Sequence, residues 1–82
     1  MRILSKEIDV VATFDKSGSI TPVKFRIDDN IVKVDRINLV NDVKFAGEDS
    51  RIFRCQSYVN NVEKLYELKF VKKTCKWYLY KM

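Results

Sequence analysis

The sequence predicts a single all-β domain, in which six antiparallel strands, mostly in a meander, curve into a small barrel or half-barrel. Three observations predict this class. Val, Ile, Phe and Tyr alternate with polar residues along most of the chain, turn-forming residues separate these runs, and no segment keeps the 3.6-residue period of a helix. The chain has 82 residues, which is enough for one domain, and we expect that domain to span residues 1–82. Curvature hides the edges that a flat sheet would expose. In chain order the expected strands are Lys6–Phe14, Ile20–Ile27, Ile31–Val40, Arg51–Val59, Val62–Val71 and Lys76–Lys81.

The first two strands form a hairpin with Ser17-Gly18 at its tip. This register pairs apolar residues on the inner face and joins opposite charges on the outer face, as a correct register should. The inner pairs are Ile8 with Ile27, Val10 with Phe25 and Ala12 with Val23, and the outer pair is Asp9 with Arg26.

The third strand follows a turn at Asp29-Asn30. The expected pairs are Ile27 with Val32, Phe25 with Val34 and Lys24 with Asp35, and Lys33 then lies beside Arg26 as a candidate phosphate site. The apolar phase changes at Asp35-Arg36, which predicts a bulge there. We expect Asp35 and Arg36 to form an ion pair that closes one end of the barrel. The alternative is that the bulge directs their side chains into a functional site. The segment Asn41–Ser50 is expected to form a loop, with a short helical turn or a lid as alternatives.

The next hairpin turns at Asn60-Asn61, two residues that tolerate positive φ, as a two-residue primed turn requires. Each expected pair joins two apolar residues or a cation and a carboxylate, except the pair of Tyr58 with Glu63. They are Val59 with Val62, Cys55 with Tyr66, Phe53 with Leu68, Arg54 with Glu67 and Tyr58 with Glu63.

The last strand follows a turn around Lys72–Cys75, and its register depends on the length of that loop. Trp77 faces either Leu68 or Phe70. In both registers Trp77 and Leu79 lie on the inner face, while Tyr78 and Tyr80 point outward.

Several short stretches carry a family resemblance: Phe14–Gly18, Pro22–Ile27, Val34–Ile37, Phe53–Ser57, Glu67–Phe70 and Thr74–Tyr80. They resemble a family of small uncharacterised bacterial all-β proteins, over the chain from about Lys6 to Lys81. The resemblance implies a cytoplasmic bacterial protein of about this length. That family has no assigned activity, so it assigns no catalytic or binding residue here.

The composition argues against catalysis. The chain has no histidine, which is the commonest general base and metal ligand, and it lacks nucleophile, phosphate-cradling and metal motifs. We therefore expect a protein that is not an enzyme, with no catalytic residue, metal or cofactor. The N-terminal segment lacks the apolar run of a signal peptide or membrane span. We expect a cytoplasmic protein that makes no membrane contact and keeps Cys55 and Cys75 reduced.

The charge and aromatic residues favour a binding module. Sixteen Lys and Arg against eleven Asp and Glu give a net charge of +5, which suits nucleic acid or an acidic protein partner. Our first hypothesis is nucleic-acid binding by bases and tyrosines of the outer face, because single strands bind by stacking and charge. Its candidate residues are Arg26, Lys33, Lys69, Lys76, Tyr78 and Tyr80.

The alternative is a protein-interaction or homodimerisation module that uses the exposed aromatic face. Aromatic residues are also enriched at protein interfaces. Its candidate residues are Tyr58, Leu65, Tyr78 and Tyr80.

Overall fold

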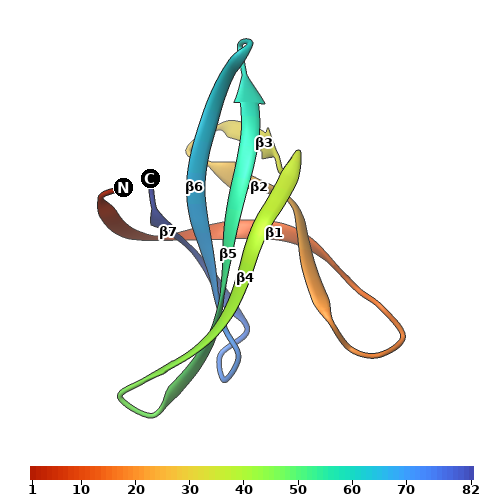
Figure 1. Ribbon diagram of the computed structural model, residues 1–82, viewed down its shortest axis with the longest axis vertical. Helices are drawn as coiled ribbons and strands as arrows, with labels where there is room; N and C mark the ends of the chain where they lie inside the picture. Colours follow the sequence, from red (N-terminus) through yellow and green to blue (C-terminus); the bar gives the residue numbers. More distant parts are fainter.

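Seven antiparallel strands form one sheet in the computed structural model, which describes residues 1–82 (Figure 1). The sheet is rolled into a half-barrel and contains no helix, as the sequence predicts, but it has seven strands rather than six. The strands are β1 (Ile3–Phe14), β2 (Ile20–Ile27), β3 (Asn30–Lys33), β4 (Arg36–Phe45), β5 (Glu48–Val59), β6 (Val62–Val71) and β7 (Lys76–Lys81).

Two meanders make up the sheet, whose strand order is β3-β2-β1-β7-β6-β5-β4. The pairing of β1 with β7 joins them, and places Ile8 opposite Trp77. Beyond this pairing Arg2 and Met82 exchange two backbone hydrogen bonds, of 2.8 and 3.0 Å. The two ends of the chain therefore lie close together, as Figure 1 also shows.

The inner faces of the strands fill the half-barrel with apolar side chains. Phe25 and Phe53 are each 2% exposed and Leu68 is fully buried, which confirms the predicted inner face at these positions, whereas Val23, also predicted to face inward, is exposed. Three tilted aromatic pairs lie within this core. The buried cluster consists of Ile20, Phe25, Phe53, Cys55, Tyr66, Leu68, Phe70, Trp77 and Leu79.

The β5–β6 hairpin has the predicted register at every pair, from Val59 opposite Val62 to Phe53 opposite Leu68. Its turn residues Asn60 and Asn61 have φ of 51° and 63°. Both angles suit the primed two-residue turn that the asparagines predict.

The β1–β2 hairpin confirms the Val10–Phe25 and Asp9–Arg26 pairs, but a register shift follows Val11. Ala12 consequently faces Pro22 and not Val23, so the predicted Ala12–Val23 pair is wrong. The cause is a longer turn. The Asp15 carboxylate accepts hydrogen bonds from the Ser17 and Ser19 amides, which closes a loop of five residues between Phe14 and Ile20.

The β2–β3 register differs from the prediction by two residues. Asp28, with φ of 54°, forms the turn with Asp29, so that Phe25 faces Val32 and Lys24 faces Lys33. A two-residue shift keeps each side chain on its face, and for this reason side-chain alternation alone could not detect it. The expected pairs Ile27–Val32, Phe25–Val34 and Lys24–Asp35 are therefore wrong.

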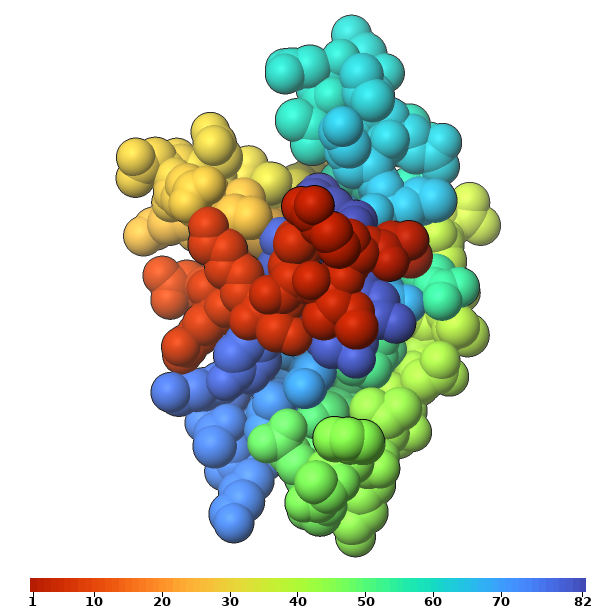
Figure 2. All heavy atoms as spheres, turned by 90° about the vertical axis from the view of Figure 1, so that its left-hand side faces the viewer, coloured from red at the N-terminus to blue at the C-terminus, as the bar shows by residue number.

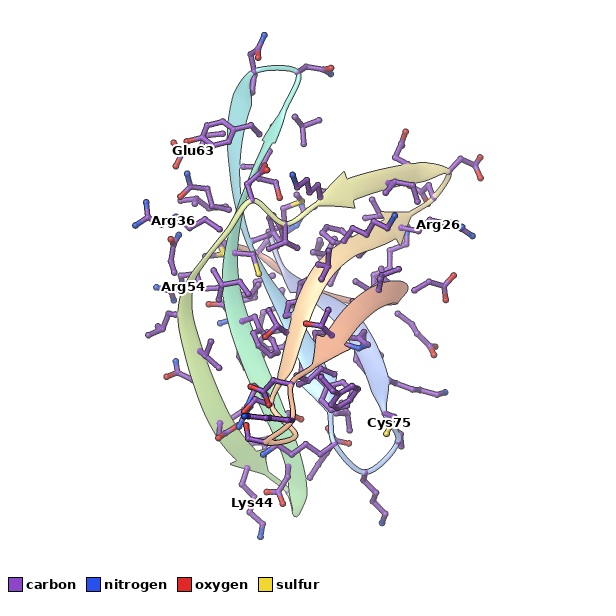
Figure 3. The ribbon with its side chains drawn as sticks, turned by 90° about the vertical axis from the view of Figure 1, so that its right-hand side faces the viewer. Arg26, Arg36, Lys44, Arg54, Glu63 and Cys75 are labelled. Carbon is purple, nitrogen blue, oxygen red and sulfur yellow. The ribbon has the colours of Figure 1, made fainter.

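The predicted third strand is two strands, β3 and β4, with a corner at Val34-Asp35. At the predicted bulge the strand is broken, and a register shift of β4 against β5 follows between Ile37 and Leu39. The corner is bonded to β5: the Asp35 carboxylate accepts the Tyr58 amide at 2.9 Å, and the Asp35 amide donates to the Gln56 carbonyl at 3.0 Å. Asp35 thus bonds β5 rather than Arg36, whose side chain points outward (Figure 3). We call this contact between Val34-Asp35, the end of β3 and β5 the seam.

The segment Asn41–Ser50 is neither a loop nor a helical turn. It is the far part of the β4–β5 hairpin, closed by Ala46 and Gly47 with φ of 52° and 79°. Alanine disfavours this left-handed region, and so the sequence carries no strong signal for a primed turn there.

The last hairpin places Trp77 opposite Phe70, which selects one of the two predicted registers. Its four-residue turn ends at Cys75, whose φ is 57°. Cys75 is exposed, whereas Cys55 is buried, and both thiols are free.

A buried chain of hydrogen bonds also closes the seam. The Ser57 hydroxyl donates to the Lys33 carbonyl at 2.6 Å, so Tyr66 must donate its own hydroxyl proton to Ser57. Burial raises the pKa of Tyr66 to about 12. Burial likewise raises the pKa of the Cys55 thiol to about 12, from an ordinary 9.0.

These two groups predict a loss of stability in alkali. In the unfolded chain Cys55 and Tyr66 lose their protons near pH 9 and pH 10, while in the fold they keep them to about pH 12. The free energy of unfolding is therefore fully retained below pH 9. It falls as pH rises further, by about 1.4 kcal/mol per pH unit for each group. Urea unfolding between pH 8 and 11 measures this slope. The Cys55→Ala/Tyr66→Phe variant should show a smaller slope, and equal slopes would contradict the assignment.

Candidate nucleic-acid interface

An open groove of about 500 Å³ lies on the outer face of β4–β7. This volume is within the usual range for binding sites. One wall is the far part of the β4–β5 hairpin, and the other is the end of β7. Figure 2 shows this hairpin, in green, projecting below the N-terminal residues and the end of β7, in red and dark blue. The lining residues are Asn41, Val43, Lys44, Phe45, Glu48, Ser50, Ile52, Arg54, Glu67, Lys69, Tyr80 and Lys81.

An ion pair forms the floor of the groove. Arg54 donates from Nε and Nη2 to Glu67 Oε2, at 3.1 and 3.0 Å. The Glu67 side chain is 8% exposed, whereas that of Arg54 is 48% exposed. The floor therefore presents the Arg54 side chain to solvent, with its charge balanced by the buried Glu67 carboxylate.

Tyr80 lies close to two lysines. Lys69 Nζ and Lys81 Nζ are each 5.2 Å from the centre of the Tyr80 ring, within cation–π range. Lys69 Nζ is also 5.9 Å from the Tyr78 ring and 3.7 Å from Glu48 Oε1. This wall of the groove therefore combines aromatic rings with ammonium groups.

A bulge in β7 brings Lys81 into the groove. Leu79 faces Leu68, but the next pair is Lys81 with Glu67, so Tyr80 has no partner on β6. Strict alternation would place Lys81 on the inner face with Leu79. The extra residue places both Tyr80 and Lys81 on the groove side.

The opposite wall presents Phe45, which is 83% exposed and precedes the Ala46-Gly47 turn. An exposed phenylalanine on this wall can offer its ring to a ligand. Beside it, Val43 is 42% exposed.

The hairpin that forms this wall is tied to the rest of the sheet by Asp42. Its carboxylate accepts hydrogen bonds from Arg51 Nε and Nη2, at 2.8 and 3.1 Å, and lies 3.3 Å from Lys72 Nζ. The Arg51 hydrogen bonds, followed by the Lys72 contact, lower the pKa of Asp42 to about 2. The wall therefore keeps its ionic support down to strongly acidic pH.

The structure brings together three of the six residues predicted for nucleic acid: Lys69, Tyr78 and Tyr80. Lys76 is near them but contacts Glu7 at 3.4 Å. Arg26 and Lys33 lie elsewhere, on β2 and β3, and Figure 3 shows Arg26 on the opposite side of the molecule from Arg54. Since Glu7 and Asp9 of β1 stand between the two groups, the six residues do not form one basic surface.

The expected cross-strand pairing of Arg26 with Lys33, on which the candidate phosphate site is based, is wrong, because Arg26 faces Ile31. Lys33 faces Lys24 instead. A second, smaller hollow of about 260 Å³ includes Lys24, Arg26 and the Asp9 carboxylate.

The four residues of the alternative interface are divided along the outer face. Tyr58 and Leu65 lie near the β5–β6 turn and are 59% and 48% exposed. Tyr78 and Tyr80 lie further along, beside Lys69. Nothing in the structure covers or joins these residues, so that interface stays a prediction.

Sequence reasoning misses Phe45, Lys81 and the groove role of Arg54. The Arg54–Glu67 pair is predicted correctly, but nothing in a strand pattern indicates that one partner is buried in a groove. Phe45 falls in the segment that the sequence predicts as a loop, and the position of Lys81 depends on the bulge.

Comparison with protein-family models, curated proteins and solved structures gives no match for this chain. The resemblance to a bacterial all-β family thus stays a prediction. No helix of the structure is long and apolar enough to span a membrane. No group of three or more Cys, Asp or Glu side chains is arranged to hold a metal ion.

Proposed function

We propose that this protein is a non-catalytic binding module that takes up single-stranded nucleic acid in the groove between the β4–β5 hairpin and β7. One observation carries the proposal: the Tyr80 ring lies beside Lys69 and Lys81 in an open groove. Unpaired bases stack on such rings, and neighbouring cations bind the phosphates.

The charge of the groove supports an anionic ligand. Its lining contains four cations, Lys44, Arg54, Lys69 and Lys81, and two carboxylates, Glu48 and Glu67. Both carboxylates already contact a cation of the groove. The groove therefore keeps a net charge of +2, and Lys44 and Lys81 are its cations without a carboxylate contact.

The aromatic residues favour a single strand over a duplex. Phe45 and Tyr80 lie on opposite walls and offer ring faces or edges, which require bases that are free of their partners. In a duplex those bases are already stacked and paired. Stacking is also tolerant of sequence, so we expect weak base preference.

The test is a titration of labelled oligo(dT) and oligo(U) with the protein at two salt concentrations. Binding should weaken with salt, with a log–log slope of at most about −3, because about four cations are available and each contributes about −0.7 on single strands. Tyr80→Ala should lower affinity about 5- to 100-fold, since stacking on one ring contributes about 1–3 kcal/mol.

Tyr58→Ala is the matched control, because it removes an exposed tyrosine from the same face but outside the groove. It should leave affinity unchanged. No binding in about 50 mM salt would overturn the proposal. So would equal losses in the Tyr58 and Tyr80 variants, or binding of poly-glutamate but of neither oligonucleotide.

A further inference from the structure

The outer edge of β4 is an open sheet edge. β4 has ten residues and lies beside β5 alone. Leu39, Val40, Val43 and Phe45 are all more than 40% exposed along it. Proteins usually shorten, cover or interrupt an edge of this kind, because its free N–H and C=O groups pair with other strands.

The opposite edge of the sheet is protected, which makes the β4 edge distinctive. β3 has only four residues, and its Lys33 carbonyl already accepts the Ser57 hydroxyl. An added strand would therefore find a longer and more accessible partner at β4.

The hairpin register shows which residues of β4 offer free backbone groups. Phe45 and Glu48 flank the two-residue turn, so they form the hydrogen-bonded pair that closes the hairpin. Such pairs alternate, so Val43 also bonds β5, while Asp42 and Lys44 direct their N–H and C=O groups to the free edge.

We infer that two copies of this chain pair antiparallel along β4, with Val43 of each copy opposite Val43 of the other. In that register Asp42 of each copy lies opposite Lys44 of the second copy, on both sides of the two-fold axis. Asp42 and Lys44 are the two residues whose backbone groups face outward, so these pairs are also the hydrogen-bonded ones.

The charges on this face complement each other beyond the central pairs. Lys44 faces Asp49 and Asp42 faces Arg51 within one copy. In the dimer these side chains form one row across four strands. Asp49 and Lys44 of one copy are followed by Asp42 and Arg51 of the second copy, so that negative and positive charges alternate. Asp42 accepts two bonds from Arg51 and contacts Lys72 once, which leaves one of its four acceptor positions for Lys44 of the second copy.

This complementarity selects a second copy as the occupant. An unrelated peptide would use the same backbone groups but would not in general match the Asp42 and Lys44 charges. A self-pairing shifted so that Asn41 faces itself would place Asp42 against Val40, and would lose both charge pairs.

Sedimentation velocity without nucleic acid, from micromolar to near-millimolar protein, tests the inference. The wild type should show a monomer–dimer equilibrium. Lys44→Asp sets a new carboxylate against Asp42 of the second copy, and Asp42→Lys sets a new ammonium group against Lys44 of the second copy. Each variant alone should dimerise at least about tenfold more weakly, because like charges directly opposite repel.

Mixing the two variants is the decisive measurement, since each copy then meets an opposite charge at both positions. The mixture should dimerise at least about tenfold more tightly than either variant alone. Lys16→Asp, the same charge change in the exposed β1–β2 turn, should leave the dimer unchanged. Should Asp42→Lys fail to fold, Lys44→Pro replaces it, because it removes an outward amide without touching the β4–β5 bonds and should abolish dimerisation.

A wild type that stays monomeric throughout would overturn the inference. Dimerisation that ignores the Lys44 changes would do so too, since it would use another register or another surface. Oligonucleotide binding by a strictly monomeric protein would leave the proposed function intact while excluding this dimer.

Discussion

Replacing Phe53 by alanine should lower the free energy of unfolding by about 3–5 kcal/mol, the cost of removing a large buried ring and leaving a cavity. Phe53 is 2% exposed, and its ring centre is 5.5 Å from that of Trp77. A domain of this size is stabilised by only about 4–12 kcal/mol in total. The substitution should therefore remove at least about a quarter of the total stability, as thermal and urea unfolding would measure.

Phe45→Ala is the matched control for this change. Phe45 is 83% exposed, so the same substitution there should alter stability by no more than about 0.5 kcal/mol. It should, however, weaken oligonucleotide binding if the ring stacks on a base. Equal destabilisation by the two substitutions would show that the assigned inner and outer faces of the β4–β5 hairpin are wrong.

Replacing Arg54 by leucine should cost about 2 kcal/mol, because it leaves the buried Glu67 carboxylate without its charge partner. Glu67 is 8% exposed at the side chain and receives both of its hydrogen bonds from Arg54. The loss should therefore come mainly from a buried carboxylate left without a partner, and urea unfolding of the wild type and the variant measures it.

The double variant Arg54→Leu/Glu67→Leu separates an unpaired charge from lost packing. Two leucines leave no buried charge, so the double variant should be more stable than Arg54→Leu alone. If the double variant loses the sum of the two single losses, the two side chains do not act as a pair. Urea unfolding of all four proteins completes the cycle.

Local sequence is sufficient wherever turn chemistry and side-chain alternation agree. Asn60-Asn61 specifies one turn, and the pairs on both faces of β5 and β6 then follow. At Asp28-Asp29-Asn30 two turns are chemically acceptable. Because a shift by two residues preserves the face of each side chain, the pattern cannot choose between them. Ala46-Gly47 lacks the residues that usually signal a primed turn, so the sequence predicts a loop where the structure has a whole hairpin.

The candidate site is harder to predict because it depends on bulges and curvature. Lys69, Tyr78 and Tyr80 follow from alternation on neighbouring strands, and the structure joins them. Lys81 reaches the groove through the β7 bulge, and Phe45 through the unexpected hairpin. The sequence prediction groups Arg26 and Lys33 with the others only because sequence does not reveal which strands are neighbours once the sheet curves.

The seam gives the half-barrel a weak side. β3 and β4 are consecutive in the chain but not paired, and the corner between them is held to β5 by bonds from Asp35 and Ser57. An opening here would break these bonds and separate the Phe25 and Tyr66 rings, but it would leave every strand ladder intact. Such a partial opening requires much less free energy than global unfolding. Solvent, and small apolar molecules with it, would therefore first enter the interior beside Phe25 and Tyr66, whose rings meet across this gap.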